Sequence, residues 1–194
     1  MRDCDENVDF IVVGSGGGSM CAALYLQSRG KRVLILEKTE LVGGTTAGAR
    51  NVSSGNNWYG IEFTGGASAN QVQGNYIGTD SSGQSALGNT QGGVAFWGVS
   101  DNTVGGSAAG AGNVISANDT GVLVGNASTN NRLQGNLIGL GADGATALGN
   151  SGNGVYFYNG GSASQTSGNL IGSDGDGSND AGERNVISGN ARGV

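Results

Sequence analysis

The feature that most limits how this chain can fold is a glycine- and asparagine-rich repeat that fills its last three quarters. The segment GNYIG at 74–78 returns as GNLIG at 135–139, and ALGN at 86–89 returns at 147–150. Each recurrence, from residue 74 to 135 and from 86 to 147, is a step of 61 residues. A fixed period of this kind indicates stacked structural units rather than one irregular core.

Short apolar segments and Asn-Val motifs recur inside each unit. The apolar segments lie at 60–63, 93–96, 121–124 and 154–157, and the Asn-Val-x-Ser motifs begin at 51, 113 and 185. Short strands separated by Gly and Asn turns, without a helical period, predict a mostly β protein with a right-handed parallel β-helix (solenoid). Glycine and asparagine tolerate the left-handed bends between strands, and stacked asparagines can form hydrogen-bonded ladders. The pattern resembles repeats of bacterial surface or secreted proteins with the pectin-lyase-like fold.

The first 47 residues have a different pattern. Residues 10–13 (FIVV) form an apolar run typical of a buried parallel strand, and a glycine-rich loop follows at 14–19. Residues 20–29 are predicted to form a helix that Gly30 ends, and 32–36 a second buried strand. This order predicts a partial Rossmann-like βαβ unit in front of the repeat, so the expected domains are 1–47 and 48–194.

The glycine loop has the chemistry of a dinucleotide site. Gly14 and Gly16 let the backbone turn sharply and approach a pyrophosphate, whose charge the start of a helix favours. Ser19 stands at the third glycine position of the usual fingerprint, and it is small enough for close helix–strand packing. Glu37 ends the second strand, where a carboxylate can accept hydrogen bonds from ribose hydroxyls.

Residues 8–47 resemble the opening of FAD-dependent dehydrogenases of the fumarate reductase and 3-ketosteroid dehydrogenase type. The resemblance implies FAD as the cofactor, with the glycines beside its pyrophosphate and Glu37 on the adenosine ribose. It implies that Lys38 and the 43–46 loop lie along the same cofactor. The candidate cofactor-binding residues are Gly14, Ser15, Gly16, Gly17, Glu37, Lys38, Gly43, Gly44, Thr45 and Thr46.

The likeness stops after Ala47, so the FAD segment is expected to be catalytically incomplete. A unit of fewer than about fifty residues cannot cover both faces of its strands. The chain has no histidine, and no catalytic residue can be assigned. Whether it is an enzyme stays open; any activity would be that of a flavin-dependent oxidoreductase.

Two sets of residues in the repeat suggest further ligands. Residues 174–180, together with Glu183, form a dense acidic loop that resembles a Ca²⁺ loop, with Asp174, Asp176 and Asp180 as the candidate ligands. The glycine at position six and the terminal glutamate of an EF-hand are absent. The other aspartates of the repeat stand singly and are expected to be turn residues. Aromatic residues recur at comparable places, namely Trp58, Tyr59, Phe96, Trp97, Tyr156, Phe157 and Tyr158. They would either pack between units or contact carbohydrate.

Charge and targeting signals limit the partners. The formal net charge is −6, and the repeat contains no lysine, so neither nucleic acid nor a membrane is an expected partner. The acidic amino terminus does not resemble a signal peptide, which predicts a cytoplasmic location, whereas relatives of the repeat would be extracellular. Cys4 and Cys21 are expected to be free thiols.

Three interpretations of function remain. The first is a flavoprotein fragment fused to the repeat. The second is a non-enzymatic surface, carbohydrate-binding or scaffold protein, in which the amino-terminal unit caps the first turn of the repeat. The third is a chimera that arose artificially or by design at the shared VGGTTAG string. An open last turn near Val194 is expected to associate with other copies.

Overall fold

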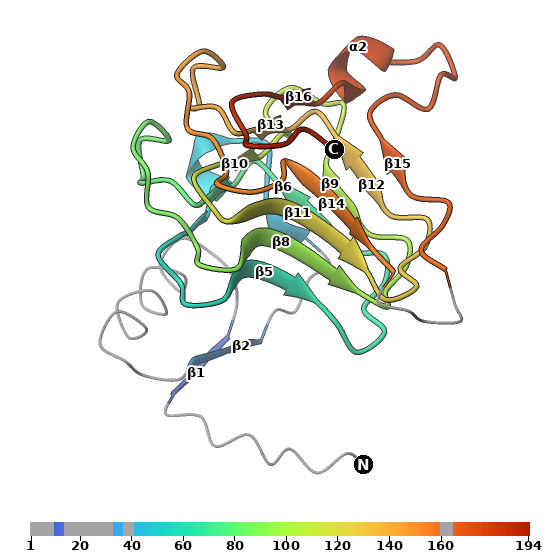
Figure 1. Cartoon of the computed structure of the whole chain (residues 1–194), viewed down its shortest axis with the longest axis horizontal. Helices are drawn as coiled ribbons and strands as arrows, with labels where there is room; N and C mark the ends of the chain where they lie inside the picture. Colours follow the sequence, from blue (N-terminus) through green and yellow to red (C-terminus); the bar gives the residue numbers. More distant parts are fainter. Residues whose placement is uncertain (1–9, 14–32, 37–40, 160–164) are drawn as a thin grey trace.

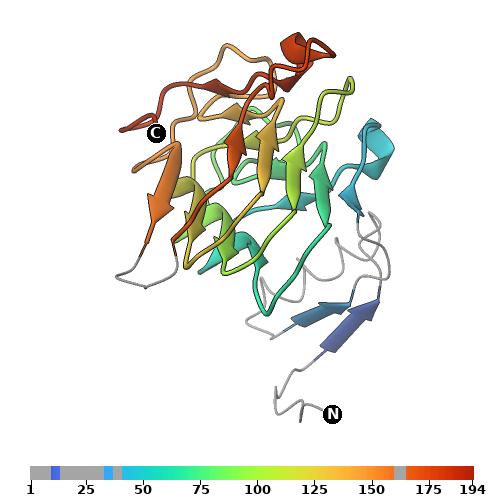
Figure 2. The ribbon, with the colours of Figure 1, turned by 90° about the vertical axis from the view of Figure 1, so that its right-hand side faces the viewer.

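Three parallel β-sheets make up most of the molecule. The computed structural model describes residues 10–13, 33–36, 41–159 and 165–194. The sheets contain five, five and four strands, and every pairing between named strands is parallel. They enclose a common interior, and Figure 2 shows the strands of one sheet lying side by side.

The strand bounds show how short each element is. Sheet B contains β3 (Leu41–Gly43), β6 (Gln71–Gln73), β9 (Thr103–Gly105), β12 (Arg132–Gln134) and β15 (Leu170–Ile171). Sheet C contains β4 (Val52–Ser53), β7 (Tyr76–Ile77), β10 (Val114–Ile115), β13 (Leu137–Ile138) and β16 (Val186–Ile187). Sheet D contains β5 (Tyr59–Phe63), β8 (Gly92–Trp97), β11 (Thr120–Gly125) and β14 (Val155–Tyr158).

The chain visits the sheets in a fixed order, B then C then D, and repeats this circuit (Figure 1). Each circuit therefore adds one strand to each sheet, beside the strand of the circuit before. Equivalent residues of successive circuits pair directly, as in Ile61↔Val94, Val94↔Val122 and Val122↔Val155. The register thus places like residues in columns, which is why the sequence repeats.

Aliphatic columns form the core. In sheet B the inward column includes Val72, Val104 and Leu133, all with no exposed surface. Sheet C contributes Ile77, Ile115 and Ile138, also fully buried; sheet D contributes, among others, the stacked rings of Phe63 and Phe96. Burial of each such side chain stabilises the fold by roughly 1.5–3 kcal/mol, so the columns supply the main driving force.

Three ladders of buried asparagines line the corners between the sheets. In each ladder the side-chain oxygen of one asparagine accepts the backbone N–H, and in most steps also the side-chain N–H, of its predecessor. The ladders are 51–75–113–136–185, 56–89–118–150–190 and 70–102–131–169. The predicted hydrogen-bonded role of the repeated asparagines is confirmed.

These sheets correct the predicted fold class. The sequence predicted a right-handed parallel β-helix, or solenoid, preceded by a separate partial Rossmann-like βαβ unit. This prediction is wrong, because the described chain forms three parallel sheets with almost no helix. Strand β3, which the prediction assigned to the βαβ unit, pairs with β6 at the start of sheet B. All-parallel sheets are otherwise typical of α/β proteins, whose crossovers contain helices; here the crossovers are loops.

Few other elements accompany the sheets. Strands β1 (Phe10–Val13) and β2 (Val33–Leu36) pair in parallel as a separate two-stranded sheet. A 3₁₀ turn, η1, spans Ala47–Ala49, and a short helix, α2, spans Asp180–Glu183. In the part of the chain that the structure describes, no helix has the length and apolarity needed to cross a membrane.

Candidate functional site

The two strands that flank the predicted dinucleotide loop are present and paired as expected. β1 and β2 run parallel, with Val13 opposite Leu36, so both strands end at the same edge. In parallel sheets ligands bind at this carboxyl edge. Gly14 and Glu37 come next in the sequence, but they lie outside the described residues, as do Ser15, Gly16, Gly17 and Lys38.

The predicted cofactor residues Gly43, Gly44, Thr45 and Thr46 lie where β3 leaves sheet B. Gly43 has φ +88°, and a side chain there would overlap the carbonyl oxygen of Gln73 in the neighbouring strand. The amide of Gly44 donates to the same carbonyl at 2.8 Å. Glycine is therefore required at position 43 because the backbone there passes close to strand β6. Thr45 and Thr46 are exposed.

The same loop occurs a second time, one step along the repeat. Residues 43–51 read GGTTAGARN, and residues 105–113 read GGSAAGAGN. Gly105 has φ +90°, and the amide of Gly106 donates to the carbonyl of Gln134 at 2.8 Å. Turns closed by Ala49 N to Thr46 O and by Ala111 N to Ala108 O are both 3.0 Å. The backbone conformation of the 43–46 loop is thus explained by its place in the sheets, and no ligand is needed to explain it.

The acidic loop gathers three carboxylates, only two of which the sequence selected. Oxygens of Asp174, Asp180 and Glu183 lie within 4.8 Å of one another, whereas Asp176 is not part of this group. Glu183 is 8% exposed and sits at the end of α2. The sequence placed Glu183 in the acidic loop but did not select it as a ligand, because it lies outside the alternating Asp-Gly run; its spacing from Asp180 places it one helical turn later.

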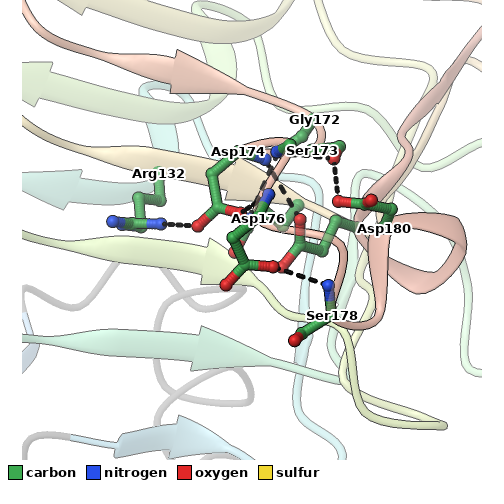
Figure 3. A network of polar contacts seen from close by, with 10 residues as sticks. Arg132, Gly172, Ser173, Asp174, Asp176, Ser178 and Asp180 are labelled. Carbon is green, nitrogen blue, oxygen red and sulfur yellow. Dashed lines mark hydrogen bonds and ion pairs between the residues drawn. The ribbon is translucent and has the colours of Figure 1, made fainter.

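Hydrogen bonds within the loop satisfy much of its charge (Figure 3). Asp174 pairs with Arg132 at 3.0 Å and receives the amide of Asp176 at 3.3 Å; its own amide donates to Glu183 at 3.1 Å. Asp180 accepts from the Ser173 hydroxyl. Asp176 accepts the amide of Ser178 at 2.7 Å, so it caps its own turn. Calcium needs six to eight oxygens, and the calcium site stays a prediction.

Single aspartates of the repeat, such as Asp80 and Asp143, accept hydrogen bonds within turns, as predicted. Asp80 accepts hydrogen bonds from the Ser82 hydroxyl and from the amides of Ser82, Gln84 and Ser85. The Ser82 bond is the main cause that lowers the pKa of Asp80. In the equivalent turn Thr146 donates to Asp143 through its hydroxyl at 2.6 Å and its amide at 2.9 Å, and these bonds lower the Asp143 pKa to about 2.

Aromatic side chains form a continuous cluster on the outer face of sheet D. Tyr59 contacts Trp58 with ring centroids 5.5 Å apart and Trp97 at 6.3 Å, and Trp97 contacts Tyr158 at 6.2 Å. Tyr158 also contacts Tyr156. Burial, followed by the nearby carboxylates of Glu62 and Asp119, raises the pKa of Tyr59. The predicted inter-strand packing is present, while Trp58 remains 56% exposed.

Glycines in the neighbouring strands make room for these rings. A side chain at Gly92 would meet the ring of Tyr59, and one at Gly125 would meet Trp97. The other two aromatics of the predicted strip, Phe96 and Phe157, lie in the inward column with Phe63. Phe96 is fully buried, whereas Phe157, in the last strand of the sheet, is 40% exposed.

The family match covers the amino-terminal part of the chain. Residues 9–58, about a quarter of the chain, match the family described as FAD binding domain. The chain is 41% identical over 59 residues to a 3-oxosteroid 1-dehydrogenase of Comamonas testosteroni, covering 30% of this chain and 10% of that protein. It is 46% identical over 56 residues to a urocanate reductase of Eggerthella lenta, covering 27% and 9%. The chain thus spans about a tenth of the relatives it matches.

No solved structure matches the chain. The family match ends at residue 58 and so includes residues 41–58, whose strands β3 and β4 the structure places in sheets B and C. The family match supports FAD as the cofactor of this segment.

Proposed function

We propose that the chain binds FAD through residues 10–40 and is catalytically incomplete on its own. The observation that carries this proposal is the FAD-binding family match over residues 9–58, together with the parallel pairing of β1 and β2 inside it. The paired ends at Val13 and Leu36 support pyrophosphate contact at Gly14–Gly17 and ribose contact at Glu37 and Lys38.

In this proposal the loop 43–46 belongs to the sheets rather than to the cofactor. Its glycines face Gln73 and repeat the conformation of Gly105 and Gly106, which lie in no matched segment. The remaining FAD contacts would come from fewer than about fifty residues, too few to enclose a whole flavin. Binding is therefore expected to be weak, with the isoalloxazine ring accessible to solvent.

The test is a flavin titration of the full chain. Protein should quench or shift FAD fluorescence, and Glu37→Gln should weaken binding about tenfold, because a charge-assisted hydrogen bond to the ribose is lost. Glu62→Gln is the matched control, since this exposed carboxylate in β5 lies outside the proposed contacts. Wild-type protein without any FAD binding at millimolar cofactor, or equal loss in both variants, would refute the proposal.

The aromatic cluster of sheet D supports a second candidate, a carbohydrate-binding face. Trp58, Tyr156 and Tyr158 are 56%, 41% and 40% exposed, and sugar rings stack on such aromatic surfaces. Trp58→Ala should abolish binding of a neutral oligosaccharide, read from tryptophan and tyrosine fluorescence. Leu87→Ala removes an equally exposed apolar side chain elsewhere and should leave binding unchanged. A wild-type chain that binds no neutral glycan would rule this candidate out.

A further inference from the structure

A groove of about 340 Å³ lies over the outer face of sheet C, and none of the aromatic cluster residues is among those that line it. Its floor includes Val114 and Leu137, which are outward-facing neighbours in β10 and β13. Its walls come from Ala108, Ala109 and Ala142, and Arg50 lies at one side. The groove thus combines a few apolar side chains with polar backbone and, among the described residues, a single cationic side chain.

The guanidinium of Arg50 is held in place by two contacts. Its Nε donates to the carbonyl of Gly74 at 3.1 Å, and its Cζ lies 4.1 Å from the centre of the Tyr76 ring. Its two terminal nitrogens have no hydrogen bond or ion pair to any residue that the structure describes. A half-buried guanidinium fixed by stacking is prepared to bind a planar or tetrahedral anion with two donors.

Glycines keep the space beside Arg50 open. The residue that precedes each ladder asparagine is Arg50 in the first circuit, but it is Gly112 in the third and Gly135 in the fourth. Both glycines line the groove, and a side chain at Gly112 would overlap the carbonyl oxygen of Gly135. None of the described residues that line the groove is acidic. The adjacent carboxylates of Asp143 and Glu183 accept hydrogen bonds within their own loops.

From this arrangement we infer a binding site for a small organic anion with an apolar body. The anionic group pairs with the terminal nitrogens of Arg50, and the apolar body covers Val114, Leu137 and Ala142. Within the part of the chain that the structure describes, Arg50 pairs with no carboxylate, although the formal net charge of the chain is −6. The volume suits a single-ring compound rather than a dinucleotide. The inference does not depend on FAD binding.

The experiment is an NMR titration of the full chain with benzoate, with benzyl alcohol as an uncharged analogue and inorganic phosphate as an anion without an apolar body. Benzoate should shift the Arg50 Nε–H and the amides of Gly112 and Leu137, and it should bind at least tenfold more tightly than either analogue. Benzyl alcohol or phosphate binding as tightly as benzoate would overturn the inference.

Variants separate a binding role of Arg50 from a structural one. Arg50→Gln should weaken benzoate binding at least tenfold, whereas Arg184→Gln should not change it, because Arg184 holds the same repeat position in AGERN but lies outside the groove. If Arg50→Gln unfolds the protein, Ala109→Phe serves instead: it fills the groove from an exposed position and should also block binding. Unchanged affinity in a folded variant of either kind would refute the site.

Discussion

Replacing one central ladder asparagine should destabilise the whole protein. Asn113 has no exposed surface, and its side chain makes four hydrogen bonds. Its oxygen accepts the backbone and side-chain N–H groups of Asn75, and its amide donates to Val72 O at 2.8 Å and Asn136 Oδ1 at 2.9 Å. Asn113→Ala removes all four bonds at once and leaves an apolar methyl among polar groups.

The expected cost follows from this count. A neutral hydrogen bond contributes about 1 kcal/mol net, so Asn113→Ala should lower the free energy of unfolding by about 4 kcal/mol. That is a large part of the roughly 5–15 kcal/mol by which folded domains are stable. Asn56→Ala is the matched control. Asn56 begins another ladder, is half-buried, and makes a single side-chain bond, to Asn89 at 2.8 Å. Its loss should cost about 1 kcal/mol.

Urea unfolding measures both variants, with far-ultraviolet circular dichroism for the sheets and the fluorescence of Trp58 and Trp97 as a second probe. The reasoning fails if Asn113→Ala costs no more than Asn56→Ala. It also fails if only one probe changes, because the ladder of Asn113 joins five successive circuits and its loss should affect the molecule as a unit.

Three further predictions follow from local geometry. Gly105→Ala should cost about 1–3 kcal/mol more than Gly144→Ala in urea unfolding, because both sites have positive φ but only Gly105 faces a carbonyl, that of Gln134; equal costs would contradict this. The Asp143 pKa is about 2 in the folded chain against an ordinary 3.8, so its stabilising effect should be complete above pH 3.8 and lost as pH falls towards 2. Carboxyl-carbon NMR shifts should show this low value, and Thr146→Val should raise it; a wild-type pKa near 3.8 would contradict the prediction. Calcium, if it binds the acidic loop, should raise the melting temperature of wild-type protein and of Asp101→Asn but not of Asp180→Asn; a melting temperature unaffected by calcium or a chelator would remove the site.

Several elements were predictable because the sequence repeats where the strands pair. The apolar segments at 60–63, 93–96, 121–124 and 154–157 became neighbouring strands of sheet D, with Ile61, Val94, Val122 and Val155 in one column. The strands at 10–13 and 33–36 were also expected. Two-residue strands such as β4 could not be read from periodicity, because alternation needs at least about four residues to be visible.

The error in fold class lay at the junction of the two sequence types. The string VGGTTAG resembles an FAD-binding loop, so the sequence assigned residues 41–43, which form β3, to the βαβ unit; the assignment of Gly43–Thr46 to the cofactor stays a prediction. The same string also resembles residues 105–110, GGSAAG. That likeness indicates that residues 41–43 belong to the repeat, because β3 and β9 lie in the same sheet. Arg50 was missed for a different reason: its partner, Tyr76, is brought close only by the stacking of circuits.

Hydrogen exchange of the full chain, with and without FAD, tests most directly whether the 43–46 loop belongs to the sheets. The amides of Gly44 and Gly106 donate to equivalent carbonyls at the same distance, 2.8 Å, so both should exchange slowly and FAD should leave both unchanged. FAD should slow exchange only in residues 10–40. Rapid exchange at Gly44 that becomes slow when FAD is added would show that the loop serves the cofactor and would contradict the account.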